Sequence, residues 1–251
     1  MAQQKGILPL KGTIGNINFY KTKDGYLARE KTSITKERIA NDPAFARTRE
    51  NGAEFGRAGQ AGKVLRTALR SLLLNTADSR MLSRMTREMM KVIQADAINE
   101  RGMRNVIDGE AELLEGFEFN VNSKLGTSLF APFTTTINRV SGLLSISIPS
   151  FVPVNMVAAP SGATHFKLVS AGVEIDFENK AYVVDVSNGS SLPLGATGTA
   201  ALTLDHQVTA NSTKPLFLVF GIEFYQEVNG NQYSLKNGAF NALALVKVSG
   251  S

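Results

Sequence analysis

The sequence predicts an α+β protein in which an N-terminal β-hairpin and α-helices precede an all-β sandwich. Two observations predict this fold class. Apolar residues recur at helical spacing up to about residue 94, whereas from Phe117 onward they alternate with a period of two. Residues 1–100 hold 18 Lys and Arg against 10 Asp and Glu, but residues 101–251 hold 9 against 12. We therefore predict a basic hairpin-plus-helical segment, an arm and a helical platform, at 1–109, and a β-sandwich domain at 110–251.

The hairpin is predicted over residues 7–31. Leu8-Pro9-Leu10 leads into it, and apolar residues approximate alternation at Ile14, Ile17 and Phe19. Lys23-Asp24-Gly25 is a turn signal, because glycine accepts the positive φ of a tight hairpin turn. A lone hairpin is not stable in water. We therefore expect this one to lie on the helices, on the β domain or on another copy of the chain.

A first helix is predicted from Pro43 to about Asn75, with Asp42 as its N-cap and an interruption near Gly52. Its middle is rich in small residues: Gly52, Ala53, Gly56, Ala58, Gly59, Ala61 and Gly62. Each glycine costs a helix up to about 1 kcal/mol relative to alanine. Two interpretations stay open. Either this stretch is a loop, or another element approaches its backbone closely.

A second helix follows, with Asp78 or Ser79 as its cap. It has an apolar stripe suited to a core or an interface, made of Leu82, Met85, Met89, Val92 and Ile93. A polar, Gly-containing linker is predicted at 97–109, and one more helical turn at 110–115.

The remaining chain predicts strands that are short, separated by turns and without helices between them. They are 117–122, 133–139, 142–149, 164–171, 173–178, 181–187, 197–205, 215–228, 231–236 and 239–248. Asn229-Gly230 between two alternating runs is a strong hairpin signal. We predict a sandwich of immunoglobulin or fibronectin type, although the Cys and Trp of an antibody domain are absent.

Few residues suggest chemistry. The chain has no Cys, which excludes disulfides and thiolate sites. His165 and His206 are expected to be surface or strand-edge residues, although a Ser–His–acid triad stays open. The glycines match neither a phosphate loop nor a dinucleotide fingerprint. The carboxylates of Glu110, Glu112, Glu115 and Glu118 are predicted to form a solvated face. We predict no enzyme, cofactor, metal or small-molecule substrate.

Two groups of residues are candidate contacts for a second copy or for a polyanion. The arm contributes cations interleaved with aromatic rings, which is how nucleic acid is often held. The helices contribute a basic face. These residues are Lys11, Phe19, Tyr20, Lys21, Lys23, Tyr26, Arg29 and Lys31 in the arm, and Lys63, Arg66, Arg70, Arg84 and Arg87 in the helices. The alternative for each group is an ordinary solvated surface.

Several segments resemble a family of uncharacterised proteins from Bacteroidota. They include Gly12-Thr13-Ile14-Gly15, the run from Gly25 to Lys31, the runs Arg38–Phe45 and Arg47–Gly52, and the closing Asn241–Val248. The resemblance spans nearly the whole chain and implies the two-part layout and a bacterial source. It implies no activity and assigns no functional residue.

The leading functional hypothesis is a non-enzymatic structural protein that self-assembles into a filament, tube or shell. A nucleic-acid-binding protein and a carbohydrate- or protein-binding module are the alternatives. Met1 to Gly6 lacks the apolar stretch of a secretory signal, and no apolar run is long enough to span a bilayer. We therefore expect a protein that starts in the cytoplasm, with export by another route left open.

Overall fold

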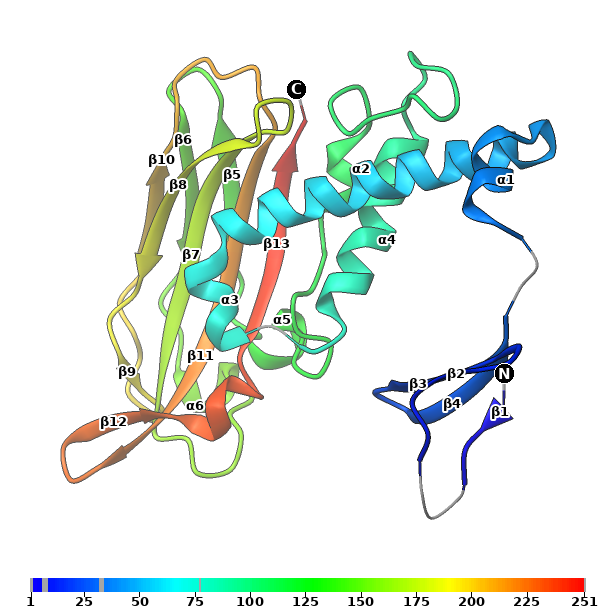
Figure 1. Ribbon diagram of the computed structural model, residues 1–251. Helices are drawn as coiled ribbons and strands as arrows, with labels where there is room; N and C mark the ends of the chain where they lie inside the picture. Colours follow the sequence, from blue (N-terminus) through cyan, green and yellow to red (C-terminus); the bar gives the residue numbers. More distant parts are fainter. Residues whose placement is uncertain (1, 6–8, 32–33, 77, 251) are drawn as a thin grey trace. The chain divides into compact units, whose positions relative to one another are not determined.

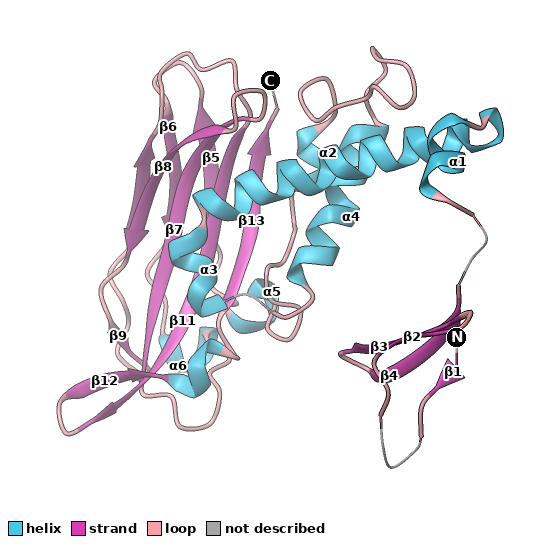
Figure 2. Cartoon of the chain, in the orientation of Figure 1, coloured by secondary structure: helices cyan, strands magenta, loops and turns pink. Residues whose placement is uncertain are grey.

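The computed structural model describes residues 2–5, 9–31, 34–76 and 78–250. It combines helices in the N-terminal half with a large curled antiparallel sheet in the C-terminal half (Figures 1 and 2). This agrees with the predicted order of α and β elements. The chain divides into two compact units, residues 1–50 and residues 51–251. The division predicted at residues 109 and 110 stays a prediction.

The first unit contains a small antiparallel sheet in the order β1-β4-β3-β2. Its strands are β1 (Ala2–Gln3), β2 (Gly12–Ile14), β3 (Ile17–Thr22) and β4 (Gly25–Glu30). The predicted hairpin is confirmed at β3 and β4, where Gly25 has a φ of +116°. The predicted lead-in at Leu8 lies outside the described residues. None of the described residues between 1 and 50 is buried.

The first unit continues into helices that begin at side-chain caps. Thr35 caps α1 (Lys36–Asn41), and Asp42 caps the 3-10 turn η1 (Pro43–Phe45) through Ala44 N, 2.9 Å away. The long helix α2 (Ala46–Ala68) runs without interruption through the Gly- and Ala-rich stretch. The interpretation of this stretch as a loop is therefore wrong.

The helix breaks at Leu69, not near Gly52, and continues as α3 (Arg70–Thr76) and then α4 (Met81–Gln94). Close approach explains one glycine, because a Cβ at Gly62 would lie 3.2 Å from Met85 Cγ. At Gly56, as at two other glycines of α2, a Cβ would meet nothing within 4 Å.

Two antiparallel sheets make up most of the second unit. One has the order β10-β6-β5, and the other has the order β12-β11-β7-β8, with β13 also paired to β11 and β9 to β7. The strands are β5 (Thr134–Asn138), β6 (Leu143–Ile148), β7 (His165–Asp176), β8 (Ala181–Asn188), β9 (Leu192–Pro193), β10 (Leu202–Gln207), β11 (Leu216–Val228), β12 (Asn231–Ser234) and β13 (Ala242–Ser249). Short helical turns connect them: η2 (Ala111–Leu114), α5 (Leu125–Ser128), α6 (Pro153–Met156) and η3 (Leu235–Gly238).

Four of the predicted strands need correction. The strands predicted at 164–171 and 173–178 are the single strand β7, because Gly172 stays in register with both neighbouring strands. The segment 117–122 forms only an isolated bridge beside β13, where Phe119 N donates to Leu243 O at 2.8 Å. The strand predicted at 197–205 begins at Leu202 and extends to Gln207.

The central strands β7 and β11 are buried on both faces. On one face, their side chains share a core with β6 through residues such as Phe166, Leu168, Leu218, Phe220, Leu144 and Ile146. On the other, they share a core with α2, α3 and α4 through residues such as Val169, Ala171, Phe217, Val219, Leu65, Leu72 and Met89. The second unit is therefore layered as helices, large sheet and small sheet, as Figure 1 shows.

This layering predicts that Gly172→Ala destabilises the protein. A Cβ at position 172 would lie 2.6 Å from His206 Cβ on the facing sheet. Overpacking of this kind costs about 1–3 kcal/mol in the free energy of unfolding, measurable by urea denaturation. The matched control is Gly56→Ala in α2, where the space is open. It should stabilise the helix by about 0.5–1 kcal/mol. Equal effects of the two variants would contradict the packing described here.

Candidate functional site

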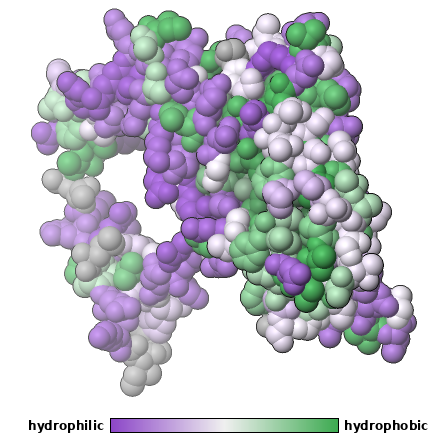
Figure 3. All heavy atoms as spheres, turned by 180° about the vertical axis from the view of Figure 1, so that it is seen from behind, coloured by the Kyte–Doolittle hydropathy of each residue, from purple (hydrophilic) through white to green (hydrophobic). Residues whose placement is uncertain are grey.

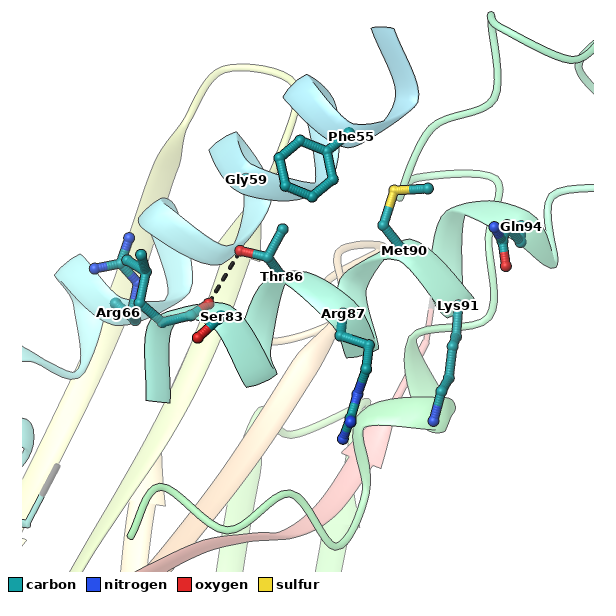
Figure 4. A pocket seen from close by; sticks show the side chains of 10 residues that line it. Phe55, Gly59, Arg66, Ser83, Thr86, Arg87, Met90, Lys91 and Gln94 are labelled. Carbon is teal, nitrogen blue, oxygen red and sulfur yellow. Dashed lines mark hydrogen bonds between the residues drawn. The ribbon is translucent and has the colours of Figure 1, made fainter. Parts of the chain in front are cut away.

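An apolar hollow of the second unit lies between α2 and α4. We call it the α2–α4 groove. It has a volume of about 710 Å³ and is lined by Phe55, Gly59, Arg66, Leu82, Ser83, Thr86, Arg87, Met90, Lys91 and Gln94. Figure 4 shows Phe55 on α2 and Met90 on α4 facing the space between the two helices. Phe55 is 60% exposed and Leu82 is 54% exposed. Of the predicted apolar stripe on α4, Leu82 therefore lies outside the core, whereas the other four members are buried.

The rim of the groove is cationic. Glu88 bridges two of its cations, with Oε1 3.0 Å from Arg87 Nη2 and Oε2 2.5 Å from Lys91 Nζ. Burial acts to raise the pKa of Glu88, but the hydrogen bonds from Lys91 and Arg87 outweigh it and hold the pKa below its ordinary value. Arg66 Nε donates to Gly62 O at 3.1 Å. The rim therefore carries a net positive charge, from Arg66, Arg87 and Lys91 against Glu88.

Arg84 has a different setting from the other predicted cations. It forms an ion pair with Asp78, donates to Glu118 O at 2.6 Å and to Phe119 O at 3.2 Å, and stacks 5.2 Å from the centroid of Phe117. These contacts join α4 to the segment beside β13. Arg84 thus anchors the helix. Lys63 and Arg70 are exposed, and a polyanion-binding role for the basic helical residues stays a prediction.

The small sheet of the first unit separates its cations onto two faces. Residues directly opposite in an antiparallel pair share a face. One face carries Lys21 with its Nζ 5.3 Å from the Tyr26 centroid, and the other carries Arg29 5.5 Å from the Tyr20 centroid. Lys11, Lys23 and Lys31 are exposed. The predicted polyanion contacts of the arm therefore do not converge on one face.

The face that carries Tyr26 is largely apolar, and we call it the arm's apolar face. The strand register places Ala2, Ile14, Ile17, Phe19, Tyr26 and Ala28 on it, together with the charged residues Lys21 and Glu30. Ile14 is 62% exposed and Ile17 is 45% exposed.

A buried ion pair that the sequence analysis did not identify joins α2 to the linker. Glu54 is 1% exposed, and its Oε1 and Oε2 lie 2.8 Å and 3.0 Å from the Nε and Nη2 of Arg104. The Arg104 guanidinium holds the pKa of Glu54 below its ordinary value, although burial acts to raise it. The helical spacing of Glu54 from Ala58, Ala61 and Leu65 could have predicted its burial, because this spacing places the carboxylate on the buried helix face.

Asp96 organises the rest of the predicted linker. Its Oδ1 accepts from the backbone N–H groups of Ile98 at 2.9 Å and Asn99 at 3.0 Å, and its Oδ2 accepts from Asn105 N at 3.0 Å. Burial acts to raise the pKa of Asp96, but these bonds and one from the Asn99 side chain lower it to about 2. The linker is therefore an ordered loop.

The predicted solvated carboxylate face includes three backbone anchors. Glu112 Oε1 accepts from Gly250 N at 2.6 Å, Glu115 Oε2 accepts from Val248 N at 3.2 Å, and Glu118 Oε2 accepts from Leu125 N at 3.1 Å. Glu110, Glu112 and Glu115 are exposed, as predicted for a solvated face, and Glu118 is half-buried. Three of these carboxylates in addition accept N–H groups at a strand end and a helix start, which would otherwise be unpaired.

The one buried histidine lies between the two sheets. His206 is 1% exposed, so the surface position is wrong, whereas it does lie in β10, an edge strand of the small sheet. Its Nε2 lies 2.8 Å from Ser170 Oγ. Within the described chain, His206 Nδ1 has no hydrogen-bond partner. Both side chains are buried in the interior, so we assign the pair to packing. His165 lies in β7 near Glu227, with Nε2 3.5 Å from Oε2.

Comparison with protein-family models, curated proteins and solved structures gave no match for this chain. The resemblance to Bacteroidota proteins therefore stays an expectation. In the part of the chain that the structure describes, no helix is long and apolar enough to cross a membrane. The same residues contain no group of three or more His, Asp or Glu side chains placed to hold a metal ion.

The Glu54–Arg104 pair predicts that Arg104→Ala is strongly destabilising. Removing the cation leaves a buried carboxylate without its ionic partner, which costs about 3–5 kcal/mol in the free energy of unfolding. Lys63→Ala is the control, because Lys63 is an exposed cation on α2. We expect it to change stability by less than about 0.5 kcal/mol. A loss below about 1 kcal/mol for Arg104→Ala, measured by denaturation at neutral pH, would contradict this assignment.

Burial of His206 predicts a pH-dependent stability. Burial lowers the pKa of the folded side chain below its ordinary value of 6.5. The unfolded chain then binds more protons below about pH 6.5, so stability should fall as the pH falls through that value. The contribution is at most about 1.4 kcal/mol per pH unit. Denaturation between pH 8 and pH 5.5 measures this slope, which His206→Gln should reduce. An unchanged slope in that variant would rule out His206 as its source.

Proposed function

We propose that this chain is a non-enzymatic structural subunit that self-assembles into a homo-oligomeric filament, tube or shell, with its N-terminal arm covered by a neighbouring copy. The observation that carries the proposal is the absence of any buried residue among those described between 1 and 50. A small sheet with an apolar face gains stability only when that face is covered.

Charge and surface hydrophobicity support the proposal. Residues 1–50 hold 10 Lys and Arg against 5 Asp and Glu, so the arm is basic, whereas residues 101–251 carry a net negative charge. Opposite charges steer the association of copies. Figure 3 shows apolar atoms gathered on one face of the second unit. Large apolar residues exposed in that unit include Phe130, Val140 and Val154. Exposed apolar patches favour association.

The proposal includes an immunoglobulin- or fibronectin-like relation for the two facing sheets. Its support is that both sheets are antiparallel and enclose one shared core.

The assembly proposal predicts that the full chain forms particles larger than the 27.0 kDa monomer. Light scattering coupled to gel filtration, with electron microscopy of the same fractions, measures this. Ile17→Asp places a charge on the arm's apolar face and should shift the particles toward the monomer. Thr13→Asp is the control, because the register places Thr13 on the opposite face of the same sheet. A wild-type chain that remains a 27.0 kDa monomer at high concentration would overturn the proposal.

A further inference from the structure

The α2–α4 groove exposes large apolar side chains that no other part of the second unit covers. Phe55 and Leu82 are each more than half exposed, and Met90 also lines the groove. Burying such side chains away from water favours association. The chemistry of the groove defines its occupant as an apolar side chain flanked by carboxylates, because the rim carries Arg66, Arg87 and Lys91.

One segment of this chain has that composition. We call it the acidic ridge, and it consists of the turn η2 with its flanking residues, Glu110, Glu112, Leu113 and Glu115. Leu113 is 50% exposed, and the three glutamates around it are exposed. An exposed apolar side chain thus stands in a segment that carries three carboxylates, two of which each hold an N–H group at the end of β13 through one oxygen.

The acidic ridge is held rigidly. Ala111 and Leu114 are each 1% exposed and belong to the core beneath the helices, so the turn is fixed from inside. Glu112 and Glu115 are oriented by the backbone N–H groups of Gly250 and Val248. A preformed contact surface loses little conformational entropy on binding.

We infer that the acidic ridge of one copy seats in the α2–α4 groove of a second copy. Leu113 fills the apolar floor beside Phe55 and Leu82, and the ridge carboxylates face the cationic rim. The inference rests on the proposed function and names the surfaces through which copies meet. The groove and the ridge are different surfaces that adjoin at Arg87, which lines both the groove and the hollow beside Leu113 and Glu115. A chain that offers its ridge to one neighbour and its groove to another builds rings or filaments.

The absence of cysteine makes a direct test available. Leu82→Cys and Leu113→Cys are prepared as separate full-length variants, mixed under assembly conditions and treated with a short bismaleimide. Mass spectrometry then identifies linked peptides. We expect a link between positions 82 and 113 of different chains. Leu74→Cys replaces Leu82→Cys in the control, because Leu74 is a helical leucine that is 74% exposed and outside the groove.

Charge substitutions give a second readout. Leu82→Asp and Leu113→Asp should each raise the concentration needed for assembly at least tenfold, whereas Leu74→Asp should leave it unchanged. All three positions are at least half exposed, and circular dichroism confirms that each variant folds.

The outcomes separate the two proposals. Assembly of the wild-type chain without a preferred link between 82 and 113, or without an effect of the charged variants, would overturn the ridge-and-groove contact and leave self-assembly standing. A wild-type chain that stays monomeric would overturn both.

Discussion

Strands β7 and β11 are apolar on both faces, and this single constraint determines the layering of the second unit. A strand buried on both faces needs a partner layer on each side. The small sheet β10-β6-β5 covers one face, and α2, α3 and α4 cover the other. The helices therefore complete the core of the β region, and the glycine at position 172 gives His206 the space to lie between the sheets.

Buried polar contacts fix the position of the helices on this core. Glu54 ties α2 to the loop at Arg104, and Arg84 ties α4 to the segment beside β13. Asn241 receives the Phe224 N–H at 2.9 Å and donates to Asn75 O at 3.0 Å, which joins the end of α3 to the sheet. Each contact satisfies backbone or side-chain groups that are costly to bury alone. Apolar packing determines which layers form, and these polar contacts fix the position of the helices on the sheet.

The assembly proposal rests on the surfaces left over after this packing. Gly52, Gly56 and Gly59 weaken α2 without any close neighbour within the described chain, and Phe55 is exposed among them. The arm, taken by itself, has an apolar face and no buried residue among those described. Under the assembly proposal, a second copy covers both surfaces.

The sequence alone determined the local structure of this protein. Its change of apolar period separated a helical part from a strand-rich part, although 117–122 forms only an isolated bridge and β5 is the first strand after it. Asn229-Gly230 and Asp24-Gly25 located tight turns, because turn chemistry is a local property. It left the Gly- and Ala-rich stretch ambiguous, because helix propensity there is weak and only packing against Met85 and the sheet decides it.

Tertiary structure alone decided the polar contacts and the composition of the groove. Glu112 and Glu115 looked solvated, yet they accept N–H groups from residues near the C-terminal end of β13. From the sequence, Arg84 belonged to a basic helix face, but in the structure it anchors α4 to the segment beside β13. Leu82 belonged to the apolar stripe of the helix, but it is exposed and lines the groove. The physical reason is distance along the chain. A buried charge is satisfied by whichever group folding brings beside it, and Glu54 and Arg104 are fifty residues apart.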